Sequence, residues 1–351
     1  MRWRYPRMTK GMRKQLQLIT QEPRVVVLCA VILMLGVITA HTSTAFLTAG
    51  NLRGMGLAAA ITFLVGMGEA GVIVTRNIDA SIGSMTGLTA FTSADLLAHH
   101  PGIGVGAVLA FALGMGAILG AINGLLVALL KLPSILVTLG TLFVYLGLLY
   151  MIAGDTEVST SGLPASYTFA ATGLVVGIPL ICWYAAILGA ALHIAARYTR
   201  RGRYWLAAGS NPAGARVLAL RPERTILASY VLSGLCCGLV GVLWGGIYPT
   251  VTAGVASNLL LQVLAVVLVG GVSIWGGEGT VAGVALGSIL FALLVNALIV
   301  LGVSSFWESA VEGALIVVTV SLNRRVFAAL RSTLGYRLTW RRLSDVPSKD
   351  V

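Results

Sequence analysis

The chain has 351 residues, of which 57% are hydrophobic and only 10% are charged. A soluble domain carries roughly a quarter charged residues, so this composition excludes a soluble protein and indicates an all-α integral membrane protein. The net charge of +12 does not indicate nucleic-acid binding, because the basic residues cluster at the ends of apolar segments, where they orient a membrane protein.

Ten apolar segments follow one another along the chain, and we predict that each crosses the bilayer as a helix. The longest connection expected outside the cell, Gly154–Thr172, carries two acidic residues and no basic one. The ten predicted spans are about Val25–Phe46, Met55–Thr75, Ser81–Leu97, Gly104–Leu130, Ser134–Ala153, Gly173–Ala196, Ile226–Ile247, Leu259–Trp275, Val281–Leu301 and Trp307–Asn323.

The basic residues predict the orientation of these spans. Segments rich in Lys and Arg resist translocation and stay in the cytoplasm. With ten spans and the N-terminus inside, all of the 24 Lys and Arg residues except Arg53 fall on the cytoplasmic side. We therefore predict that both termini are cytoplasmic. The expected parts are a basic N-terminus (residues 1–24), a transmembrane domain (25–323) with a central cytoplasmic loop (197–225), and a basic tail (324–351).

The central loop contains seven arginines and one acid, Glu223. Ser210 or Asn211 can cap a helix, and Pro212 suits a first helical turn. We therefore expect a short helix from Pro212 to Leu220 with Arg216 exposed. The loop is the largest internal surface that a cytoplasmic partner could bind. An alternative interpretation is that the loop only attaches to anionic lipid.

Ionisable side chains at membrane depth are costly, so Asp79 is a candidate functional residue. It follows Arg76 and Asn77, and this polar break precedes a helix. Non-helical backbone is tolerated in membranes only where it meets protein or water. Two interpretations stay open. Asp79 either lines a pathway or gate, or it caps the third helix and pairs with Arg76 at the inner interface.

Glu69 is the second acid at membrane depth, and we expect a buried, neutral carboxyl bonded to a neighbouring helix. A proton relay would require a second acid at similar depth, and none is evident, which disfavours an ion-coupled secondary transporter. The four cysteines and four histidines lack metal-ligand spacing. No catalytic constellation or phosphate-binding loop is present. We predict no catalytic residue, metal or cofactor in this chain.

Several separated motifs follow one another in order along about Met55–Asn323. They are TRNIDASIGSMTG at 75–87, NGLLV at 123–127, LPSILVTLGT at 132–141, GRYWLAAGSNPAGAR at 202–216, Ser233-Gly234, VGGVSIWGG at 269–277 and GVSSFW at 302–307. Together these motifs resemble the permease subunits of bacterial ABC importers for ribose and related monosaccharides. Most ribose-type members carry Gly-Gly-Ile-Asp where this chain has Arg-Asn-Ile-Asp, a version similar to the autoinducer-2 and rhamnose-type permeases.

The resemblance implies a multi-pass permease in the bacterial inner membrane that imports a monosaccharide or sugar-like signal of the ribose, rhamnose or autoinducer-2 class. It implies cytoplasmic ATPase subunits that bind ATP and Mg, a second permease subunit (identical or homologous), and an extracytoplasmic solute-binding protein. It favours the pathway interpretation of Asp79. The implied pathway or gate residues are Asn77, Asp79, Ser81, Ser84, Asn123, Thr138 and Thr141, and the implied ATPase-coupling residues are Ser210, Asn211, Pro212, Gly214 and Arg216.

Alternatives from other classes are an ion-coupled secondary transporter, and a membrane enzyme or structural bundle. Within the ABC importers, a permease for branched-chain amino acids is the nearest competitor. The block Ile-Asp-Ala-Ser-Ile-Gly at 78–83 disfavours that competitor.

Overall fold

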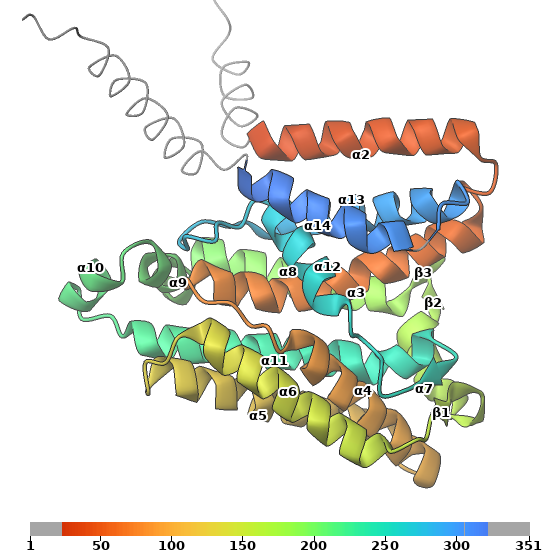
Figure 1. Cartoon of the computed structure of the whole chain (residues 1–351), viewed down its shortest axis with the longest axis horizontal. Coiled ribbons are helices and arrows are strands. Elements are labelled where there is room, and N and C mark those ends of the chain that lie inside the picture. Colours follow the sequence, from red (N-terminus) through yellow and green to blue (C-terminus); the bar gives the residue numbers. More distant parts are fainter. Residues whose placement is uncertain (1–22, 305, 322–351) are drawn as a thin grey trace, which may run out of the picture.

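The computed structural model describes residues 23–304 and 306–321, which are almost entirely helical (Figure 1). The predicted basic tails lie outside these residues, apart from the last two positions of the first tail. In Figure 1 the long helices lie across the picture, with α9 (Arg200–Ser210) and α10 (Pro212–Val217) at one end. Because these two helices form the basic loop, that end faces the cytoplasm.

Each of the ten predicted spans contains a helix. Seven of the described helices are long and apolar enough to cross a membrane. The other three predicted spans hold α4, which is more polar, and α12 and α14, which are shorter. The ten helices are α2 (Pro23–Thr42), α3 (Ala49–Val74), α4 (Ile82–His99), α5 (Val105–Ala128), α6 (Ser134–Ala153), α8 (Leu180–Tyr198), α11 (Pro222–Ile247), α12 (Leu259–Val269), α13 (Val281–Val300) and α14 (Phe306–Ser321).

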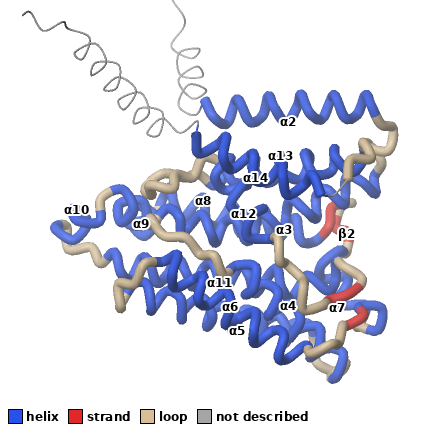
Figure 2. The backbone as a smooth tube through the Cα atoms, in the orientation of Figure 1, coloured by secondary structure: helices blue, strands red, loops and turns tan. Residues whose placement is uncertain are grey.

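Small non-helical elements gather at the opposite, outer end of the molecule (Figure 2). β1 (Val158–Ser159) pairs antiparallel with β4 (Thr250–Val251), and β2 (Leu174–Val175) pairs with β3 (Ile178–Pro179). Helix α7 (Ala165–Thr172) lies between β1 and β2 in the chain. The predicted start of the sixth span at Gly173 was therefore wrong, because a β2–β3 hairpin precedes α8.

Two of the predicted spans adjoin extended chain. The third begins after an extended stretch that separates α3 from α4, and the eighth, α12, has only 11 helical residues before a Gly-rich connection, 270–280, leads to α13. The predicted eighth span was expected to continue to Trp275, but Gly271 takes a positive φ of 87° and the helix ends at Val269. Discontinuous spans of this kind often mark the functional centre of a transporter.

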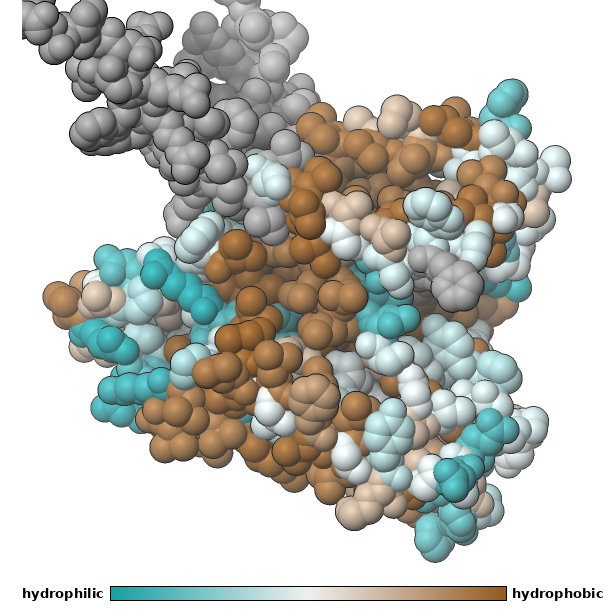
Figure 3. All heavy atoms as spheres, in the orientation of Figure 1, coloured by the Kyte–Doolittle hydropathy of each residue, from teal (hydrophilic) through white to brown (hydrophobic). Residues whose placement is uncertain are grey.

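The core surrounds α3 and α11, which are the most buried long helices, and α11 packs against α5, α3 and α4. Helices α2, α5 and α6 instead expose many large apolar side chains. Figure 3 shows this apolar surface over the middle of the visible face, with hydrophilic residues at both ends. This distribution matches a protein surrounded by lipid, with its polar groups at the two interfaces.

Helices α5 and α11 approach so closely that their glycines cannot be replaced without movement. A Cβ atom added to Gly116 of α5 would lie 2.1 Å from the carbonyl oxygen of Gly234, and one added to Gly234 of α11 would lie 2.0 Å from the carbonyl oxygen of Gly116. Gly120 and Gly238 extend the same contact. Small residues at such positions let membrane helices pack backbone to backbone.

We expect the substitution Gly234→Ala to lower the free energy of unfolding by about 1–3 kcal/mol, because the added methyl group forces the two helices apart. Gly114→Ala in α5 is the matched control, since nothing lies within 4 Å of its added Cβ. Thermal unfolding of the purified protein in detergent measures both variants. Equal melting temperatures for the two variants would contradict this packing.

Candidate functional site

The extended break between α3 and α4 lies inside the protein, where its backbone groups bond to side chains. The N–H of Ile78 donates to the hydroxyl of Ser134 at 3.3 Å. The carbonyl oxygen of Ile78 accepts from the hydroxyl of Tyr230 at 3.1 Å and from that of Thr138 at 3.3 Å. Helices α6 and α11 thus satisfy the backbone that the break leaves without helical partners, as membrane burial requires.

The Asp79 carboxylate is fully buried and accepts four hydrogen bonds. Its Oδ1 accepts from the backbone N–H of Ser81 at 3.1 Å, from the Ser81 hydroxyl at 2.6 Å and from Asn123 Nδ2 at 3.4 Å. Its Oδ2 accepts from the Ser233 hydroxyl at 3.1 Å. The side chain therefore joins the start of α4 to α5 and α11. We call Asp79, Ser81, Asn123 and Ser233 the Asp79 centre.

Asp79 does stabilise the beginning of α4, through the N–H of Ser81. The expected pair with Arg76 is not formed, because the Arg76 guanidinium donates instead to the carbonyl oxygens of Gly209 and Ser210 at the end of α9. The chain reverses direction between Arg76 and Asp79, so their two side chains bond to different parts of the molecule.

Asn123 extends the network into α5 and α6. Its Nδ2 donates to the Ser81 hydroxyl at 2.8 Å, and its Oδ1 accepts from the Tyr145 hydroxyl at 3.4 Å. Tyr145 also donates to the carbonyl oxygen of Leu119 at 2.9 Å. Tyr145 and Tyr230 were not predicted from the sequence, since no spacing distinguishes polar residues on different helices. Ser134 and Ser233 were present only as residues of family motifs.

Glu69 of α3 is also fully buried, and its Oε1 accepts from the backbone N–H of Asp79 at 3.2 Å. Its Oε2 has no hydrogen-bond partner among the described residues. The expected burial of this carboxyl is confirmed, but its partner lies in the extended break that follows α3 and not on a neighbouring helix. The inference that no second acid lies near Glu69 was wrong, because the return of the chain after α3 brings Asp79 beside it.

The structure brings together only part of the predicted pathway set. Thr138 bonds to the break, whereas Ser84 and Thr141 donate to carbonyl oxygens of their own segments, Ser81 and Thr138. Asn77 donates to the carbonyl oxygen of Thr75 and borders a cavity. The role of this set in transport stays a prediction.

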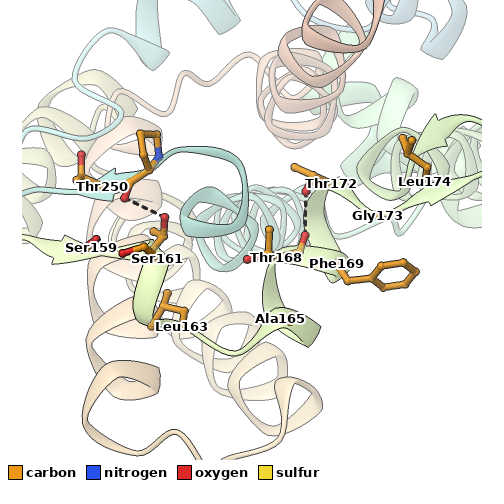
Figure 4. A pocket seen from close by; sticks show the side chains of 12 residues that line it. Ser159, Ser161, Leu163, Ala165, Thr168, Phe169, Thr172, Gly173, Leu174 and Thr250 are labelled. Carbon is orange, nitrogen blue, oxygen red and sulfur yellow. Dashed lines mark hydrogen bonds between the residues drawn. The ribbon is translucent and has the colours of Figure 1, made fainter. Parts of the chain in front are cut away.

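An outer cavity of about 860 Å³ opens between α7 and the β1–β4 sheet (Figure 4). In Figure 4, Ser159, Ser161 and Thr250 lie on one side, and Thr168 and Thr172 lie on the other. No charged residue is among the described residues that line it. The full lining is Ser159, Thr160, Ser161, Leu163, Ala165, Thr168, Phe169, Thr172, Gly173, Leu174, Pro249 and Thr250.

An inner cavity of about 510 Å³ lies at the cytoplasmic end and has a charged lining that includes Arg76, Arg216 and Glu223. Asn77, which lies within the α3–α4 break, and Ser134, which bonds to the break, also line this cavity. The two cavities lie at opposite ends of the molecule, and neither is lined by a residue of the Asp79 centre.

The predicted short helix of the central loop is present as α10. The Asn211 side chain accepts from the N–H of Gly214 at 2.9 Å, and Pro212 occupies the first turn. Ser210 is instead the last residue of α9. The helix ends at Val217 rather than Leu220, because Ala219 takes a positive φ of 56°.

The side chain of Arg216 is exposed, as expected, but it also forms an ion pair with Glu223 of α11 at 2.8 Å. Beside it, Val217 and Leu218 are 87% and 73% exposed. In Figure 1, α10 projects furthest from the bundle at the cytoplasmic end. An apolar pair on a projecting polar loop is a feature of contact surfaces. This pair was not predicted from the sequence, because single apolar residues are common in loops.

Comparison with known proteins identifies the family. A family model described as "Branched-chain amino acid transport system / permease component" matches residues 51–320. The chain is 32% identical over 276 residues to the autoinducer 2 import system permease protein LsrC of Yersinia pseudotuberculosis, which covers 79% of this chain and 78% of that protein. It is 30% identical over 328 residues to the protein of the same name from Escherichia coli O157:H7, covering 93% and 95%.

No solved structure matches the chain. The family model alone covers well over half of the sequence, and the helices of the structure occupy the matched region. The chain therefore belongs to this family of transport permease components: it is a multi-pass inner-membrane permease subunit of an ABC importer and not an enzyme, since ATP hydrolysis resides in a partner ATPase.

Proposed function

We propose that this permease imports a sugar-like signal of the autoinducer-2 class or a related monosaccharide, such as ribose or rhamnose. The observation that carries the proposal is the similarity to the Escherichia coli autoinducer 2 permease, which extends over 93% of the chain. The family description mentions branched-chain amino acids, but both relatives described above are autoinducer 2 permeases. An ion-coupled transporter is disfavoured by the family match.

The outer cavity supports a neutral, polyhydroxylated solute. Its hydroxyl groups can exchange hydrogen bonds with such a solute, whereas it offers no charged partner for the ammonium and carboxylate of an amino acid. Burying those charges without partners would be costly. We propose that the solute enters here from a separate extracytoplasmic binding protein.

Asn77, Asp79, Ser81, Ser84, Asn123, Thr138 and Thr141 are proposed to form a closed gate. Helix α4 begins at the Asp79 centre and packs against β1 and β4, which line the outer cavity. Asn77, on the other side of the centre, lines the inner cavity. A displacement of α4 would therefore act on both sides of the bilayer.

We expect Asp79→Ala to lower uptake at least tenfold, because the donors from Ser81, Asn123 and Ser233 lose a charged acceptor worth about 1.5–3 kcal/mol per hydrogen bond. Copurification with the ATPase checks that the variant still assembles. Asp95→Ala is the control, since Asp95 lies on α4, the helix that begins just after Asp79, and its carboxylate pairs only with the exposed His99 among the described residues. Normal uptake by Asp79→Ala would exclude it from the gate.

We propose that α9 and α10 dock on the ATPase subunits, with Val217 and Leu218 as the apolar contact. The predicted coupling residues support this role in different ways: Asn211, Pro212 and Gly214 build the start of α10, and Arg216 ties it to α11. The importer would also contain a second permease subunit, identical or homologous. The alternative role for the loop is attachment to anionic lipid alone.

Arg216→Glu is expected to abolish substrate-stimulated ATP hydrolysis, because the introduced carboxylate and that of Glu223 repel each other and separate α10 from α11. The double variant Arg216→Glu with Glu223→Arg restores an ion pair of opposite polarity and should recover most of the stimulation. Stimulated and basal ATP hydrolysis are measured on the assembled complex. Unchanged stimulation in the single variant would contradict the coupling role and favour lipid attachment.

Isotope uptake tests the function itself. The permease is reconstituted in vesicles with its own ATPase and binding protein, and uptake of labelled autoinducer-2, ribose, rhamnose and leucine is compared. We expect uptake of one of the three sugar-like solutes that requires ATP and persists with an uncoupler. Uptake of leucine alone, or collapse of uptake with the uncoupler, would refute the proposal.

A further inference from the structure

Three segments that are far apart in the sequence meet around the side chain of Arg76 at the cytoplasmic end. Its Nε donates to the carbonyl oxygen of Gly209, and its Nη2 donates to that of Ser210 at 2.6 Å. These are the last two residues of α9. Carbonyl groups in the last turn of a helix lack intrahelical partners, and a cation near them is favourable. Arg76 thus completes the end of α9.

The third segment is the Gly-rich connection between α12 and α13. The N–H of Gly277 donates to the carbonyl oxygen of Val74 at 2.9 Å. A Cβ added to Gly277 would lie 2.6 Å from the backbone of Ser210, and one added to Gly276 would lie 2.4 Å from Arg76 Cγ. A Cβ added to Gly209 would lie 1.7 Å from the Val74 oxygen. The three segments are therefore closely packed at this junction.

The backbone of Arg76 is itself informative. Its φ of 67° is in the left-handed region, which is unfavourable for residues with a side chain and favours glycine. An arginine at this position is therefore explained by what its guanidinium contacts and not by the turn. Lys131, in the connection between α5 and α6, has a similar φ of 56° but forms no hydrogen bond or ion pair among the described residues.

Arg76 lies three residues before Asp79, and the extended break connects them directly. On its other side, α9 continues through Asn211 into α10. The guanidinium is thus a direct side-chain connection between the proposed docking helices and the segment that carries the Asp79 centre, while Trp205 of α9 bonds to α3 at the carbonyl oxygen of Gly71. Both bonds go to backbone oxygens, so they follow the position of α9 itself and not that of a mobile side chain.

We infer that Arg76 is a positioning residue that ties the Asp79 centre to the junction of α9 and α10, so that displacement of these helices by the ATPase moves the start of α4. This inference rests on the proposed function, because it supplies the route by which ATP hydrolysis reaches the proposed gate. Asn77, the residue after Arg76, lines the inner cavity and would move together with Arg76.

The decisive variant is Arg76→Gly, which removes the guanidinium and at the same time relieves the left-handed backbone, so that the protein still folds. Lys131→Gly is the matched control: Lys131 lines the same inner cavity as Arg76, and the change removes one positive charge and relieves one left-handed residue without touching the bonds to α9. Arg76→Lys keeps the charge but cannot donate to two carbonyl oxygens in the fixed geometry of a guanidinium.

Uptake and ATP hydrolysis are measured on the complete complex in vesicles. For Arg76→Gly we expect at least a tenfold loss of uptake, since two charge-assisted hydrogen bonds are removed, while basal ATP hydrolysis stays within about twofold of the wild type because the docking helices are intact. Arg76→Lys should recover part of the uptake, and Lys131→Gly should equal the wild type. Normal uptake by Arg76→Gly would overturn the inference.

Hydrogen exchange provides a second measurement that does not depend on transport. In the wild-type complex, ATP binding should change the exchange of both α9–α10 and residues 75–81. In Arg76→Gly the change should be confined to α9–α10. A change that still reaches residues 75–81 overturns the inference. If the wild type imports none of the solutes tested, the proposed function fails, whereas the exchange measurement still decides the role of Arg76.

Discussion

The structure depends on one physical constraint, that a backbone which leaves helical geometry inside a membrane must find hydrogen-bond partners within the protein. The α3–α4 break meets this constraint through side chains of neighbouring helices. Ser134, Thr138 and Tyr230 bond to the N–H and carbonyl groups of Ile78. Since each partner comes from α6 or α11, the break can exist only while both helices are packed in place.

Helix α11 supplies hydrogen-bond donors to the break and also brings α5 to the Asp79 centre. Its Tyr230 and Ser233 bond to the break, and Gly234, the next residue, contacts the backbone of α5. That close approach brings Asn123 of α5 within reach of Ser81 and Asp79. A stripe of small residues on one helix and a polar centre on another are therefore parts of the same arrangement.

The sequence predicts the local features well, because they depend on neighbouring residues. The apolar runs locate the helices, and the order of Asn211 and Pro212 predicts the start of α10. Contacts across a chain reversal are different. The bond between Glu69 and the N–H of Asp79, and that between Arg76 and Gly209, join positions whose spacing carries no periodic signal. The ends of α10 and α12 were also misplaced, because a positive φ at a following residue stops each helix where its composition would allow it to continue.

The extended stretch before α4 and the connection after α12 are joined by a backbone hydrogen bond. The carbonyl oxygen of Val74, at the end of α3, accepts from the N–H of Gly277, in the connection that follows α12. A continuous membrane helix moves as a rigid body, whereas the extended chain beside α4 and α12 can bend while the helices themselves stay folded. Both extended segments are joined at Val74, and both contact the end of α9. A small movement of the cytoplasmic loop therefore acts on the two places where the bundle can bend. At this junction glycines pack against backbone and against the Arg76 side chain, whose two bonds to the end of α9 carry the movement to the residues before Asp79.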